Sequence, residues 1–203
     1  MKNTEIIRKF DPNQPRDEDG KWTDTGASLK SFENKIKSQK FETAGVFDKD
    51  GNLILEKDGD EDSVFFNKNE MELMKSNEGA TFTHNHPGGS SLSKADLMLF
   101  WNNNLGEMRA VSKGITHILY KTKNRTNYIL ENGLQRNILS QIYDEAFKKA
   151  EKYTDKIWYN RPNNVSDEWV KNLNYTIYHE AIKNTVNDPR LKGFLIYKVE
   201  KYE

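Results

Sequence analysis

The chain has 203 residues, which suits one domain of ordinary size or one domain with an added helical part. Its 31 basic residues balance its 31 acidic ones, so the net charge gives no argument for nucleic acid or an anionic membrane as a partner. Cysteine is absent, which excludes disulfides, thiolate zinc sites and a cysteine nucleophile.

Two further features concern location. No apolar run approaches the ~18 residues that a membrane span needs. The segment from Met1 to Phe10 is charged and lacks the apolar core of a signal peptide. We therefore expect a cytoplasmic protein with no membrane partner.

Residues 1–40 are expected to form an extended, partly ordered arm. A charged start is followed by a turn-rich segment, residues 10–23, that holds two prolines, a glycine and six charges. Such a segment cannot bury enough apolar surface to fold alone. Trp22 is the exception, and we expect it to dock on the folded part. An amphipathic stretch then leads to the core.

A mixed α/β core is expected over residues 41–133. Asp48–Gly51 is a turn that joins the first two predicted strands into a hairpin. A helix over residues 67–76 is predicted by an asparagine cap with a glutamate three residues later, and Ser93 opens a second helix. The predicted strands are 42–47, 52–56, 63–66, 80–83, 109–111, 116–120 and 127–130.

A helical extension is expected over residues 134–203. Apolar residues recur about every four positions from Leu134 to Tyr153, as in a long helix. A second helix is predicted from Ser166 to Val186, and residues 193–199 are predicted to form a closing strand. Four aromatic residues of this extension indicate helix packing, with a substrate groove as the alternative: Tyr143, Trp158, Tyr159 and Trp169.

The most informative residues of the sequence are His84, His86 and Asp96. Side chains two positions apart point to the same side of an extended chain, so both imidazoles can reach one ion from a strand end. Asp96 lies three residues into the following helix, where the helix dipole also favours a carboxylate. Two imidazoles and a carboxylate suit a zinc ion that keeps one position open for water, as catalytic zinc sites do.

Each part of this stretch also has an interpretation without metal. Ser93 followed by Asp96 is an ordinary helix start, in which the serine caps the helix and the acid supports its first turn. The segment His84-Asn85-His86-Pro87, taken alone, fits a polar loop. The presence of both parts in the right order favours the metal site.

The same residues carry a family resemblance. The run His-x-His-Pro at residues 84–87, followed by Ser-x-x-Asp at residues 93–96, resembles the His-x-His-Pro-x6-Ser-x-x-Asp motif of the JAMM (JAB1/MPN+) metalloproteases. The resemblance covers residues 41–131 and implies a mixed α/β fold related to the deaminases, a zinc ion, and cleavage of peptide or isopeptide bonds. Five residues, one fewer than is common, separate the proline from the serine. This shorter loop points away from the eukaryotic members and towards bacterial and phage ones.

The resemblance also implies roles for the site residues. The two histidines and Asp96 would hold zinc, which lowers the pKa of a bound water from about 15.7 towards about 7. A glutamate at the edge of an early strand takes the proton of that water and passes it to the leaving amine, and Glu42 matches this position best. Ser93 would donate a hydrogen bond to the oxyanion as it forms.

Other polar residues are given lesser roles. Glu56 and Glu33 are weaker candidates for the glutamate, because they lie at the far end of the return strand and in the N-terminal stretch. Asn85 is expected to shape the turn. His117 lies in an apolar strand and His179 in a helix of the tail, and both are expected to be structural.

These patterns leave two functions open. The first is a JAMM-like zinc hydrolase that cuts a protein or peptide, with a phage head protein or a ubiquitin-like conjugate as candidate substrate. The second is a phage structural or cargo protein, in the host cytoplasm or on the virion, that keeps the fold without catalysis. Residues 11–23 are similar to a short segment of tailed-phage head-associated proteins, which suggests a phage or prophage origin. A zinc nucleobase deaminase is excluded, since it needs a cysteine pair.

Overall fold

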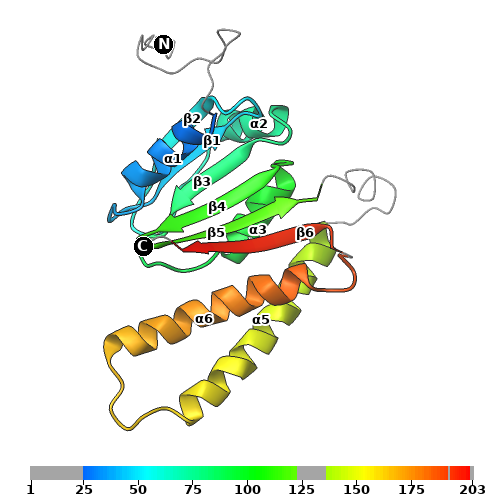
Figure 1. Cartoon of the computed structure of the whole chain (residues 1–203). Coiled ribbons are helices and arrows are strands. Elements are labelled where there is room, and N and C mark those ends of the chain that lie inside the picture. Colours follow the sequence, from blue (N-terminus) through cyan, green and yellow to red (C-terminus); the bar gives the residue numbers. More distant parts are fainter. Residues whose placement is uncertain (1–24, 123–135, 192, 202–203) are drawn as a thin grey trace.

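A computed structural model of the chain describes residues 25–122, 136–191 and 193–201. A six-stranded mixed sheet has the order β2-β1-β3-β4-β5-β6, and its neighbouring strands are antiparallel except for the pair β3 and β4. The strands are β1 (Thr43–Phe47), β2 (Leu53–Asp58), β3 (Thr81–Asn85), β4 (Glu107–Ser112), β5 (Ile115–Lys121) and β6 (Leu195–Lys201). The helices are α1 (Thr25–Ile36), α2 (Lys68–Ser76), α3 (Lys94–Asn102), α5 (Arg136–Tyr159) and α6 (Asp167–Val186). The predicted mixed α/β class is confirmed (Figure 1).

Most of the predicted strands are present. β1 and β2 form the predicted hairpin, and its turn contains Gly51 at a φ of 77°, a conformation that glycine adopts without strain. β3 overlaps the segment predicted at 80–83, β4 and β5 include those predicted at 109–111 and 116–120, and β6 closes the sheet against β5. The strand predicted at 127–130 lies outside the described residues.

One predicted strand is wrong. Residues 63–66 follow a turn at Asp60, whose carboxylate accepts hydrogen bonds from two backbone N–H groups downstream. They pair with no strand of the part of the chain that the structure describes. Val64 and Phe66 pack against the core, whereas Phe65 is 76% exposed. The side chains therefore alternate as in a strand, but among the described residues the backbone has no partner strand.

Three of the helices, α2, α3 and α6, begin directly after their predicted capping residues. Asn67 caps α2 in a complete capping box with Glu70, and Ser93 caps α3 in the same way with Asp96. Ser166 accepts a hydrogen bond from the backbone of the first turn of α6. α5 is the predicted long helix.

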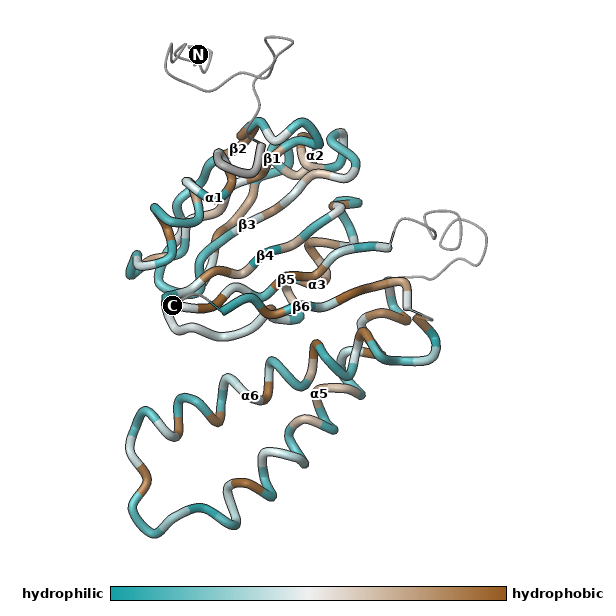
Figure 2. Tube along the Cα trace, in the orientation of Figure 1, coloured by the Kyte–Doolittle hydropathy of each residue, from teal (hydrophilic) through white to brown (hydrophobic). Residues whose placement is uncertain are grey.

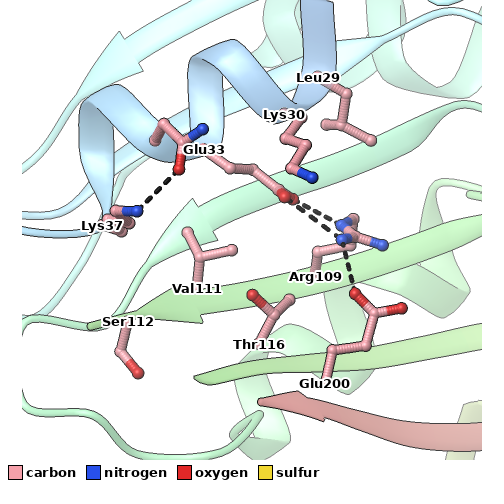
Figure 3. A pocket seen from close by; sticks show the side chains of 10 residues that line it. Leu29, Lys30, Glu33, Lys37, Arg109, Val111, Ser112, Thr116 and Glu200 are labelled. Carbon is pink, nitrogen blue, oxygen red and sulfur yellow. Dashed lines mark hydrogen bonds and ion pairs between the residues drawn. The ribbon is translucent and has the colours of Figure 1, made fainter. Parts of the chain in front are cut away.

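The two faces of the sheet are covered by different helices (Figure 1). α1, in the amphipathic stretch of the predicted arm, lies on one face. There Glu33 forms an ion pair with Arg109 of β4 (Figure 3). Glu33 also accepts a hydrogen bond from Thr83 of β3 at 2.9 Å. α2 and α3 lie on the other face, above the main core. Large buried side chains of this core include Met74, Phe82, Leu97, Phe100 and Met108.

α5 and α6 form a helical hairpin that extends past the edge strand β6 (Figure 1). Polar and apolar residues are interspersed along both helices (Figure 2). Where the hairpin meets the sheet, α5 packs against α3 and α6 packs beside β6. The predicted boundaries after residues 40 and 133 stay predictions, although β6 comes from the C-terminal extension and belongs to the same sheet. Over the described ranges, no helix has both the length and the apolar character needed to cross a bilayer.

Candidate metal centre

The two histidines of the motif lie at the end of β3 and point to the same place. The backbone N–H of His86 donates to the carbonyl of Val111, which keeps the chain extended one residue past the strand. His84 and His86 therefore lie on one side of the chain, both are buried, and their Nε2 atoms are 2.8 Å apart. This separation is close to the about 3.3 Å expected for two imidazoles on one tetrahedral zinc ion.

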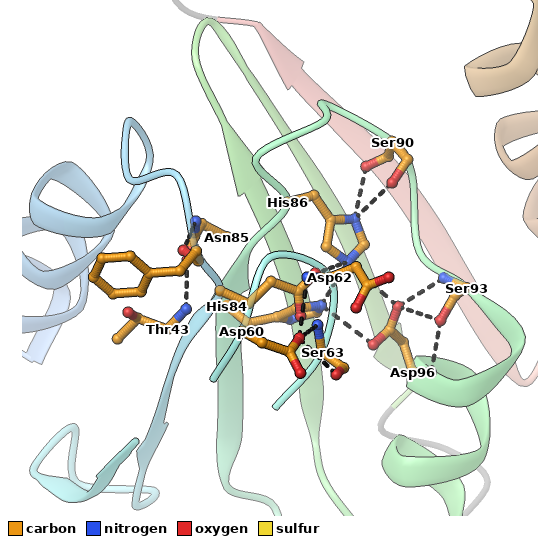
Figure 4. Close-up of polar contacts among 12 residues, drawn as sticks. Thr43, Asp60, Asp62, Ser63, His84, Asn85, His86, Ser90, Ser93 and Asp96 are labelled. Carbon is orange, nitrogen blue, oxygen red and sulfur yellow. Dashed lines mark hydrogen bonds and ion pairs between the residues drawn. The ribbon is translucent and has the colours of Figure 1, made fainter. Parts of the chain in front are cut away.

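Asp96 completes the group from the first turn of α3. Its Oδ1 lies 3.2 Å from Nε2 of His84, and its Oδ2 lies 3.7 Å from Nε2 of His86. The three ligand atoms lie within 4.8 Å of one another, so these residues form a group that could hold a metal ion (Figure 4).

Ser93 fixes the orientation of this carboxylate. Its backbone N–H and its hydroxyl both donate to Oδ2 of Asp96, at 2.7 Å each. Oδ1 is left to face His84. The helix cap and the metal ligand, which the sequence presented as alternatives, are thus compatible, because each uses a different oxygen of Asp96.

His86 is oriented by the loop that follows it. Its Nδ1 lies 2.9 Å from the carbonyl of Ser90 and 3.1 Å from the Ser90 hydroxyl. A proton on Nδ1, donated to the carbonyl, leaves the lone pair of Nε2 for a metal, as partners of metal-binding histidines commonly do. Sequence reasoning missed Ser90, although a serine four residues after the second histidine was visible.

The charges of the group also fit a cation. Burial opposes a charge on His84, but the nearby Asp96 carboxylate outweighs it, so the pKa of His84 is raised. Burial and the charge on His84 lower the pKa of His86. Burial acts to raise the pKa of Asp96, but the attraction of His84 holds it well below its usual range. Two imidazole nitrogens 2.8 Å apart need a proton or a cation between them, and this donor set suits a divalent metal.

Glu42 lies just before β1 and beside this group. Its Oε1 is 3.8 Å from Nε2 of His86, outside direct hydrogen-bond reach but close enough to act through one water. Burial, the largest cause, raises the pKa of Glu42 to about 7, while the charge of His84 opposes this and that of Asp96 adds to it. A carboxylate with this pKa exchanges protons readily near neutral pH.

Asn85 holds the segment that carries Glu42. Its Oδ1 accepts a hydrogen bond from the backbone N–H of Thr43 at 2.7 Å, and its Nδ2 donates to the carbonyl of Phe41 at 2.9 Å. Asn85 is fully buried and points away from the metal group, as strand alternation requires. We expected it to shape the turn, and it instead joins β3 to both neighbours of Glu42.

A cleft with a volume of about 590 Å³ opens above the metal group. One wall is the segment from Glu61 to Phe66, and the opposite wall is α6, through Tyr175 and Tyr178. The four aromatic residues considered as a groove do not line this cleft. Nothing in the sequence links α6 to the motif, so this wall was not predicted.

The two weaker glutamate candidates lie elsewhere. Glu33 pairs with Arg109 under α1, and Glu56 of β2 pairs with Lys35 at 2.6 Å. His117 and His179 are outside the metal group and contact the hydroxyl of Tyr197 instead.

Comparison with known proteins gives no match: no protein-family model fits the chain, and no curated protein or solved structure is significantly similar to it. Any functional assignment therefore depends on the residues and their geometry.

Proposed function

We propose that this chain is a metal-dependent hydrolase of the JAMM type, which uses zinc to cleave a peptide or isopeptide bond. The observation that carries the proposal is the position of Glu42, a buried carboxylate 3.8 Å from one nitrogen of a His-His-Asp group. A purely structural metal site has no use for a second carboxylate, besides Asp96, held just outside the ligands.

The residues of the cleft divide the reaction between them. His84, His86 and Asp96 would hold the ion, and the ion would supply Lewis acidity to the water and the substrate carbonyl. Glu42 accepts the proton of the attacking water and returns it to the leaving amine. Burial raises the pKa of Glu42 to about 7 in the metal-free protein, so this carboxylate takes up a proton more readily than an exposed one does.

Ser93 has a second role in this proposal. Its hydroxyl donates to Asp96, and during the reaction it would turn to donate to the oxyanion. The backbone N–H of Ser93 keeps its own bond to Oδ2 at 2.7 Å, so the carboxylate stays oriented.

The test compares two glutamate variants on a panel of fluorogenic peptides and ubiquitin-like isopeptide conjugates. We expect Glu42→Gln to keep the metal and to lower kcat at least about 100-fold, as loss of a general base does. Glu56→Gln, which removes an exposed carboxylate outside the cleft, is the matched control and should keep full activity.

Hydrolysis by wild type that Glu42→Gln leaves unchanged would contradict the proposed mechanism. Bound metal without hydrolysis of any conjugate would favour the alternative, a phage structural or cargo protein that keeps the site for stability.

A further inference from the structure

A second cleft, with a volume of about 850 Å³, lies between α6 and the edge formed by β5 and β6. It meets the metal cleft at the loop after β3, because residues of that loop line both cavities. The residues common to the two linings are Pro87, Gly88, Ser91 and Tyr175. The two clefts therefore adjoin each other at this loop.

The wall that α6 presents to the second cleft is polar. Asn172, Tyr175, Thr176 and His179 line it, and their spacing of three and four residues places them on one face of the helix. A helix face turned towards a sheet is normally apolar. The polar face of α6 instead lines the second cleft, opposite β5 and β6.

A polar network around Tyr197 includes three residues that line the cleft, Ser91, His117 and His179. The Tyr197 hydroxyl lies 2.6 Å from Nδ1 of His117, 2.9 Å from Nδ1 of His179 and 2.8 Å from Oγ of Ser91. A hydroxyl has one proton and two lone pairs, so these three contacts use its full capacity. Burial, more than any neighbouring charge, lowers the pKa of His117 to about 4, so that it is neutral at pH 7. The positive charge of the cleft comes from Lys113 and Lys201.

The charge of this lining is one-sided. Among the described residues that line the second cleft, none is acidic, while two are lysines and two are histidines. The metal cleft is the opposite, with Glu42, Glu61 and Asp62 on its walls in addition to Asp96.

One polar atom at the junction has no hydrogen-bond partner among the described residues. The hydroxyl oxygen of Tyr175 is buried without a hydrogen bond in the part of the chain that the structure describes. It lies against the loop, where a Cβ added to Gly88 would come within 3.3 Å of it. A buried hydroxyl usually finds a partner, so an unused one between two cavities indicates a place where a ligand binds.

We propose that the second cleft binds a carboxylate-bearing peptide segment. If the proposed hydrolase function is right, on which this part rests, that segment belongs to the substrate and lies beside its scissile bond. The lysines attract the carboxylate, the polar face of α6 supplies hydrogen bonds, and the Tyr175 hydroxyl meets the backbone that passes between the clefts.

The chain offers a direct reporter, because its four histidines divide evenly between the two clefts. The experiment is histidine-selective NMR of the intact protein, titrated with three tetrapeptides. The first is acetyl-Gly-Glu-Glu-Gly-amide, the second is acetyl-tetraglycine with a free carboxylate, and the third is the neutral acetyl-Gly-Gln-Gln-Gly-amide. The first two peptides separate acidic side chains from a chain terminus as the source of the carboxylate.

We expect at least one carboxylate peptide to shift the ring signals of His117 and His179 to saturation, and the neutral peptide to leave them unchanged. The double variant Lys113→Gln, Lys201→Gln should weaken this binding about fivefold. The matched control, Lys148→Gln with Lys152→Gln, removes the same charge from the exposed surface of α5 and should bind as wild type does.

Equal shifts from the neutral peptide, or no shift from either carboxylate peptide, would overturn the assignment. The titration needs no turnover, so it is repeated with Glu42→Gln. Peptide binding without hydrolase activity would refute the proposed function and keep the second cleft. Hydrolase activity without peptide-induced shifts would refute the binding role of the second cleft and keep the proposed function.

Discussion

The metal cleft and the second cleft share the loop after β3, but their linings carry charges of opposite sign. The metal cleft gathers carboxylates around two imidazoles, whereas the second cleft combines two imidazoles with lysines and, among its described lining residues, has no acid. In the metal cleft the histidine nitrogens converge on one another, and in the second cleft both Nδ1 atoms contact a tyrosine hydroxyl. A histidine pair alone therefore does not predict a metal site. The carboxylate delivered by the neighbouring helix makes the difference.

Strand alternation explains how one short segment serves several purposes. On β3, Phe82 and His84 face α2 and α3, while Thr83 contacts Glu33 of α1 and Asn85 bonds to the start of β1. The loop after β3 then turns beneath α6. His84 therefore belongs to the metal group, while Thr83 and Asn85, on the other side of the strand, bond to the elements around it.

The largest expected effect is the loss of the metal ion from the metal cleft, with peptide binding in the second cleft unchanged. His84→Ala removes one of the three ligands, and we expect metal content to fall from about one ion per chain to near zero, with loss of hydrolysis. Elemental analysis of protein purified without chelator measures this. Glu61→Gln, which changes a charge on the cleft wall without removing a ligand, is the control. The shifts of His117 and His179 with carboxylate peptides should survive His84→Ala, and their loss would show that the clefts are not separate sites.

Asn85→Ala should be the most destabilising of the following changes. It leaves the buried N–H of Thr43 without its partner and removes a part-buried hydrogen bond to the carbonyl of Phe41, at a cost of about 2 kcal/mol. Urea denaturation measures the free energy of unfolding. Asn174→Ala changes the same residue type on α6 and should cost less than about 0.5 kcal/mol. Equal stability of the two variants would contradict the role given to Asn85.

The pH dependence of stability tests the environment of Glu42. Its pKa in the folded, metal-free protein is raised from 4.5 to about 7, so the folded state binds a proton that the unfolded state releases. The stabilisation is fully present below pH 4.5 and is lost as the pH rises to about 7. After allowance for solvent screening, we expect wild type to lose about 1–2 kcal/mol more than Glu42→Gln over this range. Parallel stability curves for the two metal-free proteins would refute the raised pKa.

The smallest expected effect concerns the polar network around Tyr197. Tyr197→Phe removes the hydroxyl that contacts Ser91, His117 and His179, which should cost about 1 kcal/mol of unfolding free energy. It should also move the ring signals of both histidines. Tyr153→Phe, at a site that is 52% exposed, should change neither quantity. Unmoved histidine signals in Tyr197→Phe would mean that the network is not formed in solution.

The parts predicted correctly from the sequence are those set by local rules. Alternation along β3 placed both imidazoles on one side, and the spacing from Ser93 to Asp96 predicted a cap that also directs a carboxylate. The turn at Gly51 likewise predicted the first hairpin. Each of these three features is determined by a few residues that are adjacent in the sequence.

The parts that were missed depend on contacts between distant segments. Residues 63–66 have the alternation of a strand, but no strand within residues 25–122, 136–191 and 193–201 lies beside them. The amide of Asn85 reaches a segment 42 residues away, and the α6 wall comes from residues 175 and 178, far beyond the motif. No periodicity in the sequence carries this information, because it arises only when the sheet and the hairpin are assembled.

We propose that His84, His86 and Asp96 hold one metal ion. Anomalous diffraction at the zinc absorption edge, from crystals of protein supplied with zinc, tests it most directly. We predict one peak about 2.0–2.2 Å from Nε2 of each histidine and from a carboxylate oxygen of Asp96. A peak at any other place, or none in the fully supplied protein, would contradict the account.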